Sequence, residues 1–155
     1  MARSLVGHSL GPSILLKYIS EERTATPIAG TFLVAAPYWG VEDWEVDEYV
    51  LQADFASKLP GGLPMFFYHS RDDELVPFGH LALYTEKLPQ ARFREFDGRG
   101  HQFDDDLSEV AHDIEGLERS ESSYCCQTTN TGELRFRALL SESGVDRLEL
   151  ARCLP

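Results

Sequence analysis

Two short apolar runs constrain the fold of this chain more strongly than any other feature. Residues 31–36 and 64–68 are rich in β-branched and aromatic side chains, lack a regular polar alternation, and end in turn-forming residues. Strands that are buried on both faces of a parallel sheet have this pattern. We therefore expect these two runs to form central strands of a parallel sheet.

Further strand-like and helical segments alternate along the chain. Residues 91–96 alternate apolar and charged side chains, which favours a strand nearer the sheet edge, and residues 4–6 predict a short first strand. Apolar residues spaced three and four apart predict helices over residues 12–20, 77–88 and 107–117, and a short helix is expected around residues 51–59. This alternation indicates the α/β class, with about four parallel strands, right-handed crossovers and flanking helices.

The composition of the chain changes after Glu118. Residues 120–131 are mostly small and polar, and apolar residues then return at helical spacing over residues 134–154. We expect an α/β domain in residues 1–118 and a divergent, helical extension in residues 119–155.

A Gly-x-Ser-x-Gly sequence at residues 7–11 lies between the first short strand and the first helix. In this context the serine occupies a sharp strand-to-helix turn, the nucleophile elbow, and glycines on either side relieve crowding around it. Ser9 is therefore the candidate nucleophile, and the amide of Leu10 is the candidate donor to an oxyanion. The simpler alternative for Ser9 is an ordinary helix N-cap.

A candidate acid and a candidate base follow in the order that this kind of site requires. Asp72 and Asp73 come directly after the strand that ends near residue 68, and His101 follows residues 91–96 on a glycine-rich loop. The carboxyl ends of parallel strands share one edge of a sheet, so these side chains are expected to meet Ser9 there. The residues alone do not decide which of the two aspartates is the acid. The alternative role for the aspartates is a turn residue, and the alternative for His101 is an ordinary loop histidine.

Three motifs together resemble the α/β-hydrolases, particularly the small serine hydrolases of the retinoblastoma-binding protein nine type. They are Gly-His-Ser-Leu-Gly, Asp-Asp-Glu-Leu-Val-Pro and Gly-Arg-Gly-His-Gln-Phe, and the resemblance covers about residues 4–116. It implies that Asp73, three residues before the Val-Pro pair, is the acid and that His101 is the base. It also implies ester or amide hydrolysis through an acyl-enzyme, with no cofactor and no metal.

The resemblance further implies that the elbow belongs well inside such a fold, whereas Ser9 stands near the first residue of this sequence. We therefore expect a truncated α/β-hydrolase fold that lacks the first strands and the loop with the second oxyanion amide. A missing oxyanion donor slows such reactions by about 10²–10³. An inactive relative that serves as a protein-binding module is the alternative, and a partner chain or self-association is expected to cover the open strand edge.

The net charge of the chain argues against some classes of binding partner. Lys and Arg number 14 against 26 Asp and Glu, which gives a formal charge of −12 that repels phosphate backbones and anionic membrane surfaces. We expect a small-molecule ester or amide substrate, no nucleic acid and no membrane. The absence of a secretory-type apolar segment near residue 1 favours a cytoplasmic location.

Two secondary features have both a structural and a functional interpretation. Trp39, Trp44 and Tyr49 lie in a long connection and either line an acyl pocket over Ser9 or pack that connection onto the domain. The acidic run at residues 104–106 suggests a cation site at first sight. Its position before a helix favours a solvated helix start, because carboxylates are stabilised near a helix N-terminus.

Overall fold

A computed structural model describes residues 2–22, 26–122, 124–128 and 134–138 of the chain. It divides into two compact units, Met1–Val110 and Ala111–Pro155. Among the described residues, no helix combines the length and the apolar character needed to cross a membrane.

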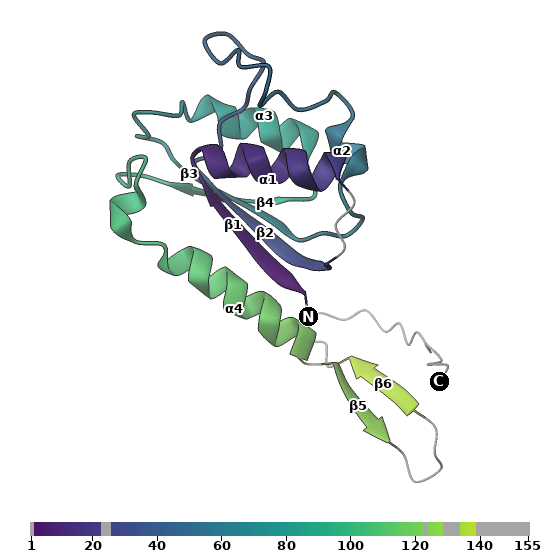
Figure 1. The fold of residues 1–155 in the computed structure, drawn as a ribbon. Helices are drawn as coiled ribbons and strands as arrows, with labels where there is room; N and C mark the ends of the chain where they lie inside the picture. The colour runs from purple at the N-terminus through teal and green to yellow at the C-terminus, as the bar shows by residue number, and fades with distance from the viewer. Residues whose placement is uncertain (1, 23–25, 123, 129–133, 139–155) are drawn as a thin grey trace. The chain divides into compact units, whose positions relative to one another are not determined.

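The first unit is built on a sheet of parallel strands. Its order is that of the chain: β1 (Arg3–His8), β2 (Ile28–Val34), β3 (Met65–Ser70) and β4 (Arg92–Phe96). The connections contain α1 (Leu10–Glu21), α2 (Phe55–Lys58) and α3 (Gly79–Lys87), and Figure 1 shows these helices on one face of the sheet. Right-handed crossovers between strands that follow one another across a sheet place their helices on the same side. The predicted α/β class with a parallel sheet is confirmed.

The core lies between these helices and the sheet. Leu33 of β2 and Phe67 of β3 are fully buried and belong to one apolar cluster with Leu16 of α1 and Tyr84 of α3. Phe67 packs on Tyr84 with ring centroids 4.8 Å apart. Each fully buried side chain of this kind stabilises the fold by about 1.5–3 kcal/mol, so the helix-side core holds the strands in position.

Strand register brings the carboxyl ends of the strands to one edge of the sheet. The backbone amide of Ser9 donates to the carbonyl of Val34 at 3.0 Å, just beyond the paired strands β1 and β2. At the ends of β3 and β4, the amide of Arg71 donates to the carbonyl of Phe96 at 2.8 Å. The segments that follow β1, β3 and β4 therefore start from the same edge.

The second unit differs from the helical extension predicted for it. The helix predicted over residues 107–117 is present as α4 (Ser108–Ser122), so the predicted boundary at residue 118 falls inside it. After it, β5 (Tyr124–Thr128) and β6 (Leu134–Ala138) form an antiparallel pair, and the helix prediction is wrong for these residues. Apolar and arginine residues alternate over residues 134–138 with the period of a strand, which the longer helical pattern obscured. Residues 139–155 lie outside the described part.

Candidate active site

Ser9 occupies a strained turn between β1 and α1. Its backbone angles are φ 59° and ψ −110°, a combination that costs a non-glycine residue about 1–3 kcal/mol and that clusters at functional sites. The Ser9 side chain makes no capping hydrogen bond to α1. The elbow geometry is therefore present, and Ser9 stands at the N-cap position of α1 without capping the helix with its side chain.

The two glycines of the motif have different roles. A Cβ atom added to Gly7 would stand 2.8 Å from the carbonyl carbon of Gly11 and 2.8 Å from the nitrogen of Pro12, closer than real Cβ atoms approach backbone. A Cβ added to Gly11 would meet nothing within 4 Å. The prediction that glycine relieves crowding is confirmed at Gly7 and is wrong at Gly11, because the tight approach is between the end of β1 and the first turn of α1.

His101 lies within hydrogen-bond distance of the Ser9 hydroxyl. Its Nε2 is 3.0 Å from Ser9 Oγ, although 92 residues separate the two in the chain, and its side chain is only 2% exposed. The other ring nitrogen, Nδ1, faces the carboxylate of Asp73 and must carry the proton, because a carboxylate only accepts. Nε2 of neutral His101 is then an acceptor that can take the proton of the serine.

Asp73 holds His101 through both carboxylate oxygens. Nδ1 of His101 lies 2.9 Å from Oδ2 and 3.0 Å from Oδ1, and the Asp73 side chain is fully buried. The backbone amides of Leu75 and Val76 donate to Oδ1 at 2.9 and 2.8 Å. This turn, in which an aspartate accepts from amides two and three residues ahead, fixes the orientation of the carboxylate.

Asp72, the other candidate acid, anchors the loop that carries the base. Its Oδ1 accepts the amides of Gly98 at 2.9 Å and Gly100 at 3.3 Å, and the Ser70 hydroxyl also donates to it. The Ser70 hydrogen bond and these amides hold the pKa of Asp72 below its ordinary value. The structure thus brings Asp73, and not Asp72, to His101.

Two further side chains hold the peptide groups of His101 itself, and the sequence analysis did not connect them to the base. Glu74 Oε2 accepts the amide of His101 at 3.2 Å, and Nε2 of His8 lies 2.9 Å from the His101 carbonyl. His8 directly precedes the nucleophile, so this hydrogen bond ties the elbow to the base loop. The only signal in the sequence was that both residues adjoin a candidate catalytic residue.

The candidate oxyanion donor is placed by the start of α1. Leu10 is the first residue of this helix, so its amide has no acceptor within the helix. The positive end of the helix dipole adds to the attraction for developing negative charge. Leu10 also directly follows Ser9 in the elbow, which is where a donor to the tetrahedral intermediate is required.

The acidic run after His101 belongs to the turn that leads into α4. Asp104 and Asp105 have positive φ angles of 51° and 56°, a conformation that aspartate tolerates better than most residues. Asp106 Oδ1 accepts the amide of Ser108, the first residue of α4, at 3.0 Å. These contacts agree with the predicted helix start.

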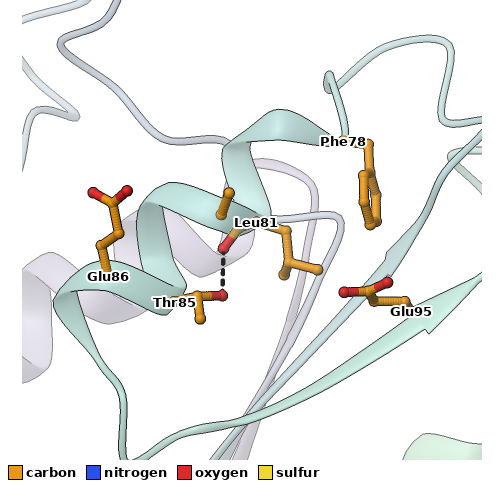
Figure 2. A pocket seen from close by; sticks show the side chains of 6 residues that line it. Phe78, Leu81, Thr85, Glu86 and Glu95 are labelled. Carbon is orange, nitrogen blue, oxygen red and sulfur yellow. Dashed lines mark hydrogen bonds between the residues drawn. The ribbon is translucent and has the colours of Figure 1, made fainter.

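The aromatic residues of the long connection pack against one another and on α1. The Trp39 ring lies 5.1 Å from both Trp44 and Tyr49, and its indole N–H donates to Ser13 Oγ at 2.7 Å. A hollow of about 430 Å³ lies elsewhere, between α3 and β4, and is lined by Phe78, Leu81, Ala82, Thr85, Glu86 and Glu95 (Figure 2). That hollow contains none of the candidate catalytic residues, so an acyl pocket formed by the tryptophans stays a prediction.

Comparisons with known proteins identify the family and the fold. A family model described as serine hydrolase matches residues 2–108. The ydeN gene product from B. subtilis superposes with a TM-score of 0.64 at 21% identity, over 75% of this chain and 65% of that one. Est1E from Butyrivibrio proteoclasticus has a TM-score of 0.57 at 16% identity, over 79% of this chain and 62% of that one.

A third solved structure, the esterase domain of a Rhodothermus marinus protein, has a TM-score of 0.54 at 18% identity and covers 75% of this chain and 59% of that one. No curated protein with significant sequence similarity was found. The chain therefore spans 59–65% of the length of these three structures, and at such identities they show a common fold.

Proposed function

The chain belongs to the serine hydrolase family of α/β-hydrolases, and from this premise we propose that it cleaves an ester or amide bond of a small molecule through an acyl-enzyme formed on Ser9. One observation carries the proposal. A continuous hydrogen-bonded series runs from Ser9 Oγ to His101 Nε2 at 3.0 Å and from His101 Nδ1 to Asp73 Oδ2 at 2.9 Å. A hydroxyl becomes a useful nucleophile only when such a base removes its proton.

In the first half of the reaction, His101 Nε2 takes the proton of Ser9 Oγ while this oxygen attacks the substrate carbonyl carbon. Asp73 stabilises the resulting imidazolium and keeps the ring in the required tautomer. The carbonyl oxygen becomes an oxyanion, to which the amide of Leu10 donates. Collapse of this intermediate breaks the bond to the leaving group, which takes the proton from His101 and leaves an acyl group on Ser9.

In the second half, a water molecule replaces the leaving group. His101 removes one proton from the water as its oxygen attacks the acyl carbon, and the second tetrahedral intermediate forms at the same position. Its collapse returns the proton to Ser9 Oγ and releases a carboxylic acid. The enzyme is regenerated without any external oxidant, reductant or metal.

Pre-steady-state hydrolysis of 4-nitrophenyl acetate tests this proposal. We expect a burst of nitrophenol that approaches one equivalent of enzyme, because acylation releases the phenol before the acyl group is hydrolysed. Ser9→Ala is expected to abolish the burst. Ser20→Ala is the matched control, because this buried serine of α1 donates to the carbonyl of Lys17 and contacts none of the candidate catalytic residues among the described hydrogen bonds. Equal activity of the wild type and Ser9→Ala would refute the proposal.

The outer edge of β1 supports a second proposal, that this edge binds a second copy of the chain. In the described sheet β1 pairs with β2 alone, and the apolar side chain of Val6 in this strand is 49% exposed. Exposed strand edges of this kind pair readily with other chains. Light scattering after size-exclusion chromatography should show a mass that rises with concentration and falls in Val6→Lys. A monomer at every concentration would contradict it, and a dimer without a burst would favour an inactive binding module.

A further inference from the structure

A second histidine, His69, contacts the acid of the proposed site. It lies near the end of β3, its side chain is fully buried, and the proposed reaction does not use it. Its Nε2 lies 3.0 Å from the backbone carbonyl of Val76 and 3.3 Å from Oδ2 of Asp73. The same Asp73 oxygen receives the Nδ1 proton of His101.

These contacts fix the tautomer of His69. A carbonyl oxygen and a carboxylate oxygen both accept hydrogen bonds, so Nε2 of His69 must carry a proton that it shares between them. Ordinary N–H···O hydrogen bonds measure about 2.7–3.2 Å between the heavy atoms. The contact with Val76, at 3.0 Å, is therefore the stronger one, and the contact with Asp73, at 3.3 Å, is the weaker one. The Nε2–H group of His69 thus links the Asp73 carboxylate to Val76, the last residue of the turn that orients this carboxylate.

The surroundings of His69 keep the ring neutral. Burial lowers the pKa of His69, and this effect outweighs the opposing influence of Val76 and Asp73. Nδ1 has no hydrogen-bond partner among the described residues, so a second proton there would be buried without an acceptor. The ring of Phe78 packs edge-on against His69 with centroids 5.6 Å apart and offers an apolar contact.

We propose that His69 is a positioning residue for the hydrolase reaction: its neutral Nε2–H, shared between Val76 and Asp73 Oδ2, holds the carboxylate in the orientation that receives His101. This inference rests on the proposed function, since it assigns a role relative to the acid. Loss of the N–H would remove this donor from the Val76 carbonyl and would leave Asp73 Oδ2 with the Nδ1 proton of His101 alone among the described contacts, in a region that excludes water. The carboxylate would then rotate more freely away from His101.

His80 offers a matched control. It is also a buried histidine with a lowered pKa, caused mainly by desolvation, and it lies on α3. Its Nδ1 accepts the amide of Tyr38 at 2.8 Å, and its ring packs on Trp44 with centroids 5.0 Å apart. A substitution at His80 therefore measures what the loss of a buried histidine does to the fold without removing a hydrogen bond to Asp73.

The experiment compares the rates at which a fluorophosphonate probe labels Ser9 in the full chain. His69→Phe keeps the ring volume and removes the donor, and we expect labelling to slow on the order of tenfold. His69→Gln places an amide N–H near the position of Nε2 and should stay within about threefold of the wild type. His80→Phe should label at the wild-type rate even where its melting temperature falls.

Wild-type labelling of His69→Phe, or an equal loss in His80→Phe, would overturn the proposal. Failure of the wild type to label at all would instead refute the proposed function. If His69→Phe does not fold, the nitrogen-15 resonances of the His69 ring in the wild type decide the matter. A neutral Nε2–H form that persists from pH 8 to about pH 6 is expected, and an Nδ1–H tautomer would overturn the inference.

Discussion

The elbow that carries Ser9 and the loops that carry Asp73 and His101 are held in different ways. Ser9 is positioned by backbone geometry: a positive φ angle, a strand-to-helix turn and the bare Cα of Gly7. The acid and base are positioned by side chains that accept amide hydrogens, chiefly Asp72 and Glu74. Added side-chain bulk should therefore disturb the position of Ser9, and loss of a hydrogen-bond acceptor should disturb the loops that carry Asp73 and His101.

The largest expected effect separates the two adjacent aspartates. Asp73→Asn should lower kcat by about 10⁴, because an amide in place of the carboxylate favours the wrong tautomer of His101. Asp72→Asn retains a carbonyl acceptor for Gly98 and Gly100 and should cost less than about tenfold. Steady-state hydrolysis of 4-nitrophenyl acetate measures both. A larger loss of kcat in Asp72→Asn than in Asp73→Asn would identify Asp72 as the acid and would contradict the roles given to the two aspartates.

The next effect separates the two glycines of the elbow. Gly7→Ala should destabilise the fold by about 1–3 kcal/mol through overpacking and slow acylation by about a hundredfold, since a displacement near 1 Å misplaces the nucleophile. Gly11→Ala introduces its methyl group into open space in a helix and should stabilise the fold by about 0.5–1 kcal/mol. Thermal unfolding and burst kinetics test the pair. Equal stability of the two variants would show that bulk at residue 7 is tolerated.

The smallest expected effect is a dependence of stability on pH that arises beside the acid. Burial lowers the pKa values of His69 and His80 in the folded state from an ordinary value of 6.5. Below that pH the unfolded chain binds more protons than the folded chain, so the free energy of unfolding should fall as the pH drops from about 6.5. Above it, both states hold neutral rings and this contribution is absent.

Urea denaturation at pH 7.5 and pH 5.5 measures this effect. We expect a lower midpoint at pH 5.5 in the wild type and a smaller difference in His69→Gln. Asp72 and Asp106, whose pKa values are lowered from 3.8, add their own loss only below about pH 4 and do not confuse this window. An unchanged midpoint would show that the buried histidines take up protons without cost.

The fold was largely predictable from sequence because its signals are local. The apolar runs at residues 31–36 and 64–68 correspond to β2 (Ile28–Val34) and β3 (Met65–Ser70), with boundaries displaced by a few residues. Periodicity failed in the second unit. Alternation over five residues of β6 (Leu134–Ala138) is too short to outweigh a longer helical pattern, and only the pairing with β5 decides between them.

The candidate site was predictable where chain order determines geometry. Ser9, Asp73 and His101 follow the parallel strands β1, β3 and β4, so a shared sheet edge follows from topology alone. The roles of Asp72 and His69 were not predictable, because they depend on which backbone groups the loops present after folding. Adjacent aspartates look alike in a sequence and differ only in the direction of their side chains.

Localisation of a fluorophosphonate adduct in the full chain tests the central claim most directly. Digestion after Arg3 and Lys17 yields a peptide that contains Ser4, Ser9 and Ser13, so fragmentation must distinguish the three. We predict a single adduct on Ser9 that disappears in His101→Ala, because the base that activates the hydroxyl lies 3.0 Å from it. An adduct on Ser4 or Ser13, or labelling of Ser9 that survives the loss of His101 undiminished, would contradict the account.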